Sequence, residues 1–147
     1  KVMKNKVIGL SVAFTLATLM VGCANVTTGQ LHAPLEVMPT EVCIIRNPQV
    51  TIDAAIPSLQ SAFQRRGIKS TVVDDVGACS SEYRLSYVMR RSWGATTYLG
   101  LAELTLYRNN AIVSTAKYKA GSMTLTKWGK TAERIDKTVG KLLGEPD

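Results

Sequence analysis

Three cysteines, Cys23, Cys43 and Cys79, are the residues of this sequence whose type and spacing most favour chemistry. A cysteine can form a thioether, a disulfide or a bond to a metal. A zinc site needs further cysteine or histidine ligands at short spacings, and the chain has one histidine, His32. We therefore expect neither a metal nor a cofactor, which leaves the thioether and the disulfide as the chemistry of these thiols.

The first cysteine follows a segment with the order of a secretory signal. Lys1, Lys4 and Lys6 form a cationic head, residues 7–21 carry no charge and no proline, and Gly22 precedes Cys23. This order is typical of an exported precursor. The apolar run is shorter than the roughly 20 residues of a membrane-spanning helix. We predict a signal peptide over residues 1–22.

Residues 19–23, Leu-Met-Val-Gly-Cys, resemble the lipobox at which the signal peptidase of bacterial lipoproteins cuts. In that pattern an aliphatic residue, here Met20, lies three places before the cysteine. The resemblance implies that Cys23 carries a diacylglyceryl thioether and an acylated amine, with fatty acids such as palmitate, and several acyl chains anchor a protein firmly. No aspartate follows Cys23, so we expect the periplasmic side of the outer membrane. A plain signal peptide with a chance cysteine is the alternative.

With Cys23 assigned to lipid, Cys43 and Cys79 remain as a pair. A disulfide is the default for two such thiols in the oxidising periplasm. Closing a loop of about 37 residues contributes roughly 4 kcal/mol in the chain-entropy model. Two buried free thiols, which behave as small apolar side chains, are the alternative.

A tryptophan beside two arginines is the best candidate for binding a partner. Trp93 follows Arg90 and Arg91 where a strand is expected to end, and Gly94 comes next. Tryptophan and arginine dominate the energetic centres of interfaces, so an exposed Trp93 could contact a protein, a peptide or a sugar. The interpretation we favour is a tryptophan folded back to close the end of the core.

The last expected helix carries a basic stripe opposite its apolar face. Trp128 lies on the apolar side and is expected in the core. The stripe consists of Lys130, Arg134, Lys137 and Lys141. We expect these four side chains to be exposed and dispensable for folding, and contact with an anionic membrane surface is the functional alternative.

No arrangement of residues predicts an enzyme. The single histidine precedes the expected domain, and nucleophilic catalysis needs a base beside the nucleophile. Asp74 and Asp75 are adjacent, but neighbouring residues of a strand point to opposite faces. We therefore interpret this acidic pair as a solvated strand end.

Charge and length predict one modest domain. The chain carries 18 basic and 11 acidic residues, and three of the basic residues precede Cys23, which leaves a mature net charge of +4. That charge does not indicate nucleic acid by itself. Residues 23–40, which include Pro34 and Pro39, are predicted to be a lipidated, flexible tether. Residues 41–147 are predicted to form a single periplasmic domain.

Hydrophobic patterns after residue 40 predict seven elements in the order β-α-β-β-β-β-α. Asn109 and Asn110 are expected in a hairpin turn, because asparagine tolerates positive φ. The elements are a strand over 42–45, a helix over 52–66, strands over 70–75, 82–91, 98–107 and 111–119, and a helix over 127–143. Two amphipathic helices and a mostly antiparallel sheet of about five strands predict an α+β two-layer sandwich with both helices on one face.

Five segments of the domain, residues 41–48, 79–87, 91–93, 102–107 and 125–131, resemble a family of small, uncharacterised envelope lipoproteins from Gram-negative bacteria. The resemblance extends from Val42 to Leu143, and Gly94 departs from the larger polar residue of that pattern. It implies a lipidated, disulfide-containing α+β domain and no known catalytic residue.

Together these observations predict a non-enzymatic, membrane-anchored adaptor or binding module of the cell envelope. Its expected partners are the membrane, reached through the lipid, and an envelope protein. A periplasmic inhibitor or ligand-binding lipoprotein that uses the Trp93 loop is the alternative.

Overall fold

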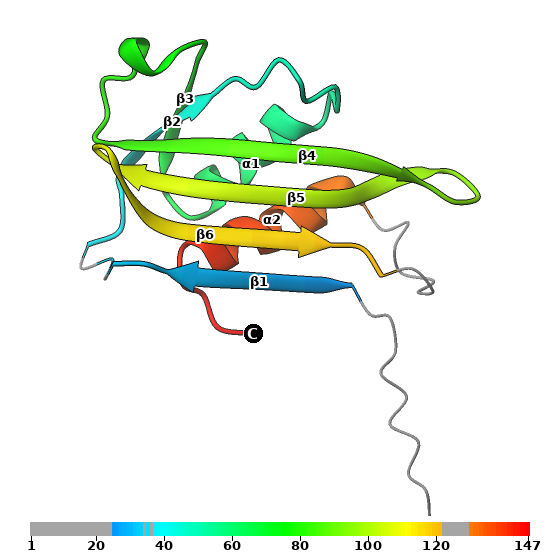
Figure 1. Cartoon of the computed structure of the whole chain (residues 1–147). Coiled ribbons are helices and arrows are strands. Elements are labelled where there is room, and N and C mark those ends of the chain that lie inside the picture. Colours follow the sequence, from blue (N-terminus) through cyan, green and yellow to red (C-terminus); the bar gives the residue numbers. More distant parts are fainter. Residues whose placement is uncertain (1–24, 34, 36, 122–129) are drawn as a thin grey trace, which may run out of the picture.

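The computed structural model describes residues 25–33, 35, 37–121 and 130–147. Six strands form one mixed sheet, and both α-helices pack on the same face of it (Figure 1). The elements in chain order are β1 Val26–Leu31, β2 Glu41–Ile45, α1 Ala55–Arg65, β3 Lys69–Val73, the 3-10 helix η1 Val76–Ala78, β4 Tyr83–Trp93, β5 Thr97–Arg108, β6 Ala111–Lys119 and α2 Thr131–Leu142. The predicted α+β class and helix arrangement are confirmed.

The strand order is β1-β6-β5-β4-β2-β3. Strands β1, β6, β5 and β4 pair antiparallel, whereas β2 pairs parallel with both β3 and β4. Helix α1 connects β2 to β3, as a crossover between parallel strands requires. The turn between β5 and β6 has Asn109 at a φ of 54°, as expected for an asparagine in this hairpin.

The core lies between the sheet and the two helices. Alternate residues of β4, from Tyr83 to Met89, face the helices and are buried, as their apolar and polar alternation predicts. Helix α1 contributes Leu59 and Phe63. Helix α1 begins at Ala55, three residues later than predicted, which places Pro57 in the first turn, where its missing N–H has no helical partner to lose.

The predicted disulfide between Cys43 and Cys79 is present, with the two Cα atoms 5.8 Å apart. Cys43 lies on β2 and points away from the helices, because its neighbours Val42 and Ile44 occupy the core side. It is nevertheless buried. The disulfide joins the segment after β3, through Cys79, to this outer side of β2.

Strand β1 occupies residues that were predicted to belong to the flexible tether. Its backbone pairs with β6 from Val26, opposite Lys119, to Leu31, opposite Ser114. The prediction of a tether over residues 23–40 is therefore wrong for these six residues. The segment lies at the edge of the sheet, and its backbone groups find their partners on a strand more than 80 residues later in the chain.

Close packing between β1 and α2 gives a test of this arrangement. An added Cβ at Gly29 would lie 2.5 Å from the carbonyl oxygen of Lys141. Gly29→Ala is therefore expected to lower the free energy of unfolding by about 1–3 kcal/mol, because the strand and the helix must separate. Urea denaturation would measure this loss. Thr28→Ala, on the exposed side of the same strand, is the matched control, and equal stability of the two variants would contradict the docking of β1 on α2.

Candidate functional site

One end of the sheet carries an exposed tryptophan among basic side chains. Val26, Lys119, Leu101 and Arg90 occupy one row across four neighbouring strands, β1, β6, β5 and β4. Strands β4 and β5 continue past this row as a two-stranded hairpin (Figure 1). We call residues 91–98 the hairpin tip.

Trp93 lies in the hairpin tip and is 81% exposed, so the prediction that it closes the core is wrong. Arg91 pairs with Leu99, which is the last buried residue at this end of β5, and Trp93 pairs with Thr97, two residues farther out. The tryptophan therefore lies beyond the end of the core. The turn that follows is closed by Gly94, whose N–H donates to the carbonyl of Thr96 at 3.1 Å.

The four basic residues of α2 do not share one exposed stripe. Lys130 and Lys137 are exposed. Arg134 is half-buried, with its guanidinium carbon 5.7 Å from the centre of the Tyr118 ring. The Lys141 side chain is 14% exposed and pairs with Asp147. The expectation of a uniformly solvated face is therefore wrong for Arg134 and Lys141.

Lys130 is exposed and immediately precedes α2. Thr131, the next residue, lines a small depression together with Arg91 and Tyr98. Lys119 ends β6 at the same end of the sheet (Figure 1). The hairpin tip, the end of β6 and the start of α2 thus place exposed cations together, although only Arg90, Arg91 and Lys130 were named from the sequence.

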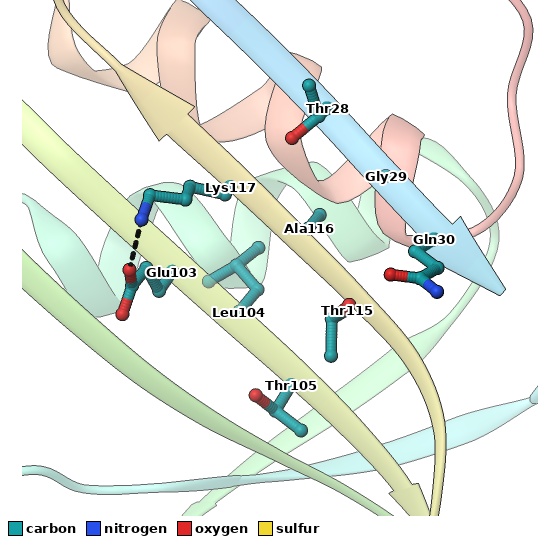
Figure 2. A pocket seen from close by; sticks show the side chains of 9 residues that line it. All are labelled: Thr28, Gly29, Gln30, Glu103, Leu104, Thr105, Thr115, Ala116 and Lys117. Atoms are coloured by element: carbon teal, nitrogen blue, oxygen red, sulfur yellow. Dashed lines mark ion pairs between the residues drawn. The ribbon is translucent and has the colours of Figure 1, made fainter. Parts of the chain in front are cut away.

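The sheet face without helices has an open depression of about 430 Å³ between β1, β6 and β5 (Figure 2). Glu103 and Lys117 form an ion pair of 2.8 Å at one side of it. Its lining residues are Thr28, Gly29, Gln30, Glu103, Leu104, Thr105, Thr115, Ala116 and Lys117. Hydroxyl and amide groups of this kind can hydrogen-bond a polar ligand or an extended peptide. Sequence reasoning missed this feature because β1, which forms one side of it, lies about 80 residues before β6 in the chain and was not predicted.

The structure brings no catalytic group together among the described residues. His32 Nε2 lies 3.2 Å from Thr115 Oγ1, so the histidine is docked on β6 and not free in a tether. This pair is exposed, and no described carboxylate orients the imidazole as an activated nucleophile requires. Asp74 pairs with Arg46 at 3.1 Å, whereas Asp75 accepts the N–H of Ala78. The two carboxylates therefore diverge, in agreement with the sequence-based interpretation.

Metal binding and membrane-spanning helices can be assessed only for the described residues. Within the described ranges no group of three or more His, Cys, Asp or Glu side chains could hold a metal ion. None of the helices in these ranges is long and apolar enough to cross a membrane. Cys23 and Trp128, which were predicted as the lipid site and a core residue, lie outside the described residues.

The sheet, the helices and the β1 edge define a two-layer α+β domain of a recognisable fold. That fold is similar to PelC from Paraburkholderia phytofirmans, in two structures described as PelC dodecamers, one of them a point variant. The variant has a TM-score of 0.59 and 18% sequence identity over 82% of this chain and 99% of that chain. The other has a TM-score of 0.59 and 17% identity over 83% and 99% of the two chains. At this identity the similarity shows the fold alone. No family model and no curated protein sequence matches the chain.

Proposed function

We propose that the mature chain is a membrane-anchored, non-enzymatic envelope lipoprotein that acts as an adaptor by assembling with copies of itself. The observation that carries this proposal is the similarity of nearly the whole domain to a protein found as a dodecamer. The signal-like segment before Cys23 supports export and lipidation.

The sheet has two different edges, β1 and β3, which suits the formation of a ring. When one surface of a subunit meets a different surface of the next, repeated contacts close into a ring if the rotation allows it. A ring whose axis is normal to the membrane presents the same end of every copy to the bilayer. Lipids on all copies of Cys23 would then enter one leaflet, so assembly and anchoring are compatible.

Lipidation is tested by Cys23→Ser. The variant is expected to lose lipid labelling and to remain uncleaved or become soluble, because the sulfur that bears the diacylglyceryl group is absent. Mass spectrometry of the native mature protein should show an acylated Cys23. An unmodified cysteine at that position would contradict the anchor.

Assembly is tested on the native lipoprotein extracted in mild detergent. Light scattering should give a protein mass that is a multiple of the monomer mass and that persists on dilution. Chemical crosslinking in intact envelopes should give a ladder of the same multiples. A monomer in both measurements would exclude self-assembly and leave the anchor unaffected.

A ligand-binding lipoprotein or inhibitor that uses the Trp93 loop is the second candidate, and the 81% exposure of Trp93 favours it. A large aromatic side chain left in water is a typical centre of a protein interface. A pull-down from crosslinked envelopes should compare the native protein with Trp93→Ala. A partner lost from the variant would favour this candidate, whereas a partner retained by the variant would place the interface elsewhere.

A further inference from the structure

The lipid site and the hairpin tip lie at the same end of the sheet, if Cys23 is lipidated as proposed above. Strand β1 begins at Val26, only three residues after Cys23. Three residues span at most about 11 Å, even when the chain is fully extended. Val26 shares its cross-strand row with Arg90, after which the hairpin tip begins.

The domain cannot stand far from its anchor, because the chain is fixed almost as soon as it leaves Cys23. The Asn25 side-chain oxygen accepts the N–H of Gly121 at 2.8 Å, next to the first pair of β1 with β6. A lipid on Cys23 would therefore hold this end of the sheet against the membrane, in contrast to a long tether.

The hairpin tip can reach the same plane as the lipidated cysteine. From Leu101 to Thr97 the hairpin extends four residues past the row of Val26, which is about 13 Å of strand. Strand β4 lies three strand spacings from β1, or about 14 Å across the sheet. Trp93 therefore lies about as far beyond the row of Val26 as Cys23 can reach from Val26. Across the sheet, Trp93 and Cys23 are separated by about half of the sheet's width.

The side chains at this end suit the headgroup region of a bilayer. Tryptophan prefers the membrane–water interface, because its ring is apolar and its N–H needs a polar partner. Exposed cations lie at this same end of the sheet: Arg91 in the hairpin tip, Arg90 and Lys119 in the row of Val26, and Lys130 immediately before α2. The exposed acidic residues near the helix starts at this end are Asp53 and Glu133. Residues 83–102, which form β4, the tip and the start of β5, contain no acidic residue.

We propose that the hairpin tip docks into the anionic headgroup region of the leaflet that holds the Cys23 lipid, with the Trp93 ring at the interface and the four cations against lipid phosphates. Each basic residue near an anionic membrane surface adds to this attraction. The lipid supplies the affinity for the membrane, and the hairpin tip sets the orientation of the sheet. The opposite end, with the β5–β6 turn, then faces the periplasm.

Fluorescence of the lipidated, full-length mature protein tests this orientation. The protein is purified from membranes and reconstituted into vesicles of phosphatidylethanolamine and phosphatidylglycerol. Trp128→Phe leaves Trp93 as the single tryptophan, and circular dichroism verifies that this variant is folded. Its emission should shift to shorter wavelength on reconstitution. Lipids that carry a quencher near the headgroup should reduce this emission severalfold.

A tryptophan at the other end of the sheet is the matched control. Asn110→Trp, in a chain that also carries Trp93→Phe and Trp128→Phe, places the probe at the exposed β5–β6 turn. This probe should remain unquenched although the protein is anchored by the same lipid. In the Trp93 protein, Arg90→Glu together with Arg91→Glu should weaken the quenching without releasing the protein from the vesicles.

Two outcomes would overturn the proposal, and they differ in what else they affect. Water-exposed, unquenched emission from Trp93 in a protein whose Cys23 is acylated would exclude docking of the hairpin tip and leave the lipoprotein assignment intact. Unmodified Cys23 in the mass spectrum would remove the anchor, and with it both the orientation and the proposed function.

Discussion

Removal of the Cys43–Cys79 disulfide is expected to lower the free energy of unfolding by about 4 kcal/mol. The bond joins residues 36 positions apart, so it removes a large part of the conformational freedom of the unfolded chain. Domains of this size are stable by only about 5–15 kcal/mol, so the loss is a substantial part of the total. In the folded state the same bond joins the segment after β3 to β2.

Guanidinium denaturation of the native protein with and without a reductant measures the contribution of the disulfide to the free energy of unfolding. The double variant Cys43→Ala, Cys79→Ala is a second measure, and it adds the loss of two sulfur atoms, one of them buried on β2. The reduced protein and the double variant should both unfold at a lower denaturant concentration than the oxidised native protein, and the double variant should unfold at the lowest concentration. A midpoint that does not change on full reduction would show that the loop is held by other contacts.

The parts of the fold that follow from local patterns were predictable. Strand β6 was predicted over residues 111–119 and is observed as Ala111–Lys119. The alternation along β4 and the paired asparagines before β6 also gave correct elements. In each case the signal lies within about ten residues of sequence, because apolar spacing and turn residues are local properties.

Strand β1 could not be predicted because its stability depends on distant residues. Its sequence, VTTGQL, has little hydrophobic pattern, and its inward positions include Gly29, which packs against the backbone at Lys141. This contact also explains the error on Lys141, whereas Arg134 is half-buried against Tyr118 of β6. A helical wheel assumes one buried side, whereas β1 and the end of the chain cover a second side of α2 and enclose Lys141.

Candidate sites that combine residues of several strands could not be predicted from the sequence either. The sequence identified Trp93 and its arginines, but only the strand register shows that they share an end with Val26. The depression between β1, β6 and β5 depends on the same register. Sheet pairing therefore contributes the information about function that the linear sequence lacks.

Arg66 connects both helices and the end of the chain, and its replacement should be the other strongly destabilising change. Its side chain is 16% exposed. Its Nη1 donates to Asp136 Oδ1 at 2.7 Å and to the Ala62 carbonyl at 2.8 Å, and its Nε donates to Glu145 Oε1 at 2.6 Å. Arg66→Met keeps an unbranched apolar stem and removes every hydrogen-bond donor of the side chain. Two carboxylates then lose their principal partner, and we expect a loss of about 2–3 kcal/mol.

The cluster of Arg66 with its carboxylates should also make the free energy of unfolding depend on pH. Burial disfavours the charged form of Asp136, but the hydrogen bonds from Arg66 and Arg65 outweigh it, so the pKa of this carboxyl lies below its ordinary value of 3.8. A carboxyl with a lowered pKa stabilises the folded state above the unfolded value and loses this effect as the pH falls through the folded value. At neutral pH, Asp136→Asn should therefore be clearly less stable than the native protein, and the difference should shrink as the pH falls below about 3.8.

Asp74→Asn is the matched control, because the Arg46–Asp74 pair is exposed and such pairs contribute about 0–1 kcal/mol. Urea denaturation of the three proteins at pH 7 and at several acidic values measures the effect, and a difference for Asp136→Asn that is the same at every pH would exclude a charged role for this carboxylate.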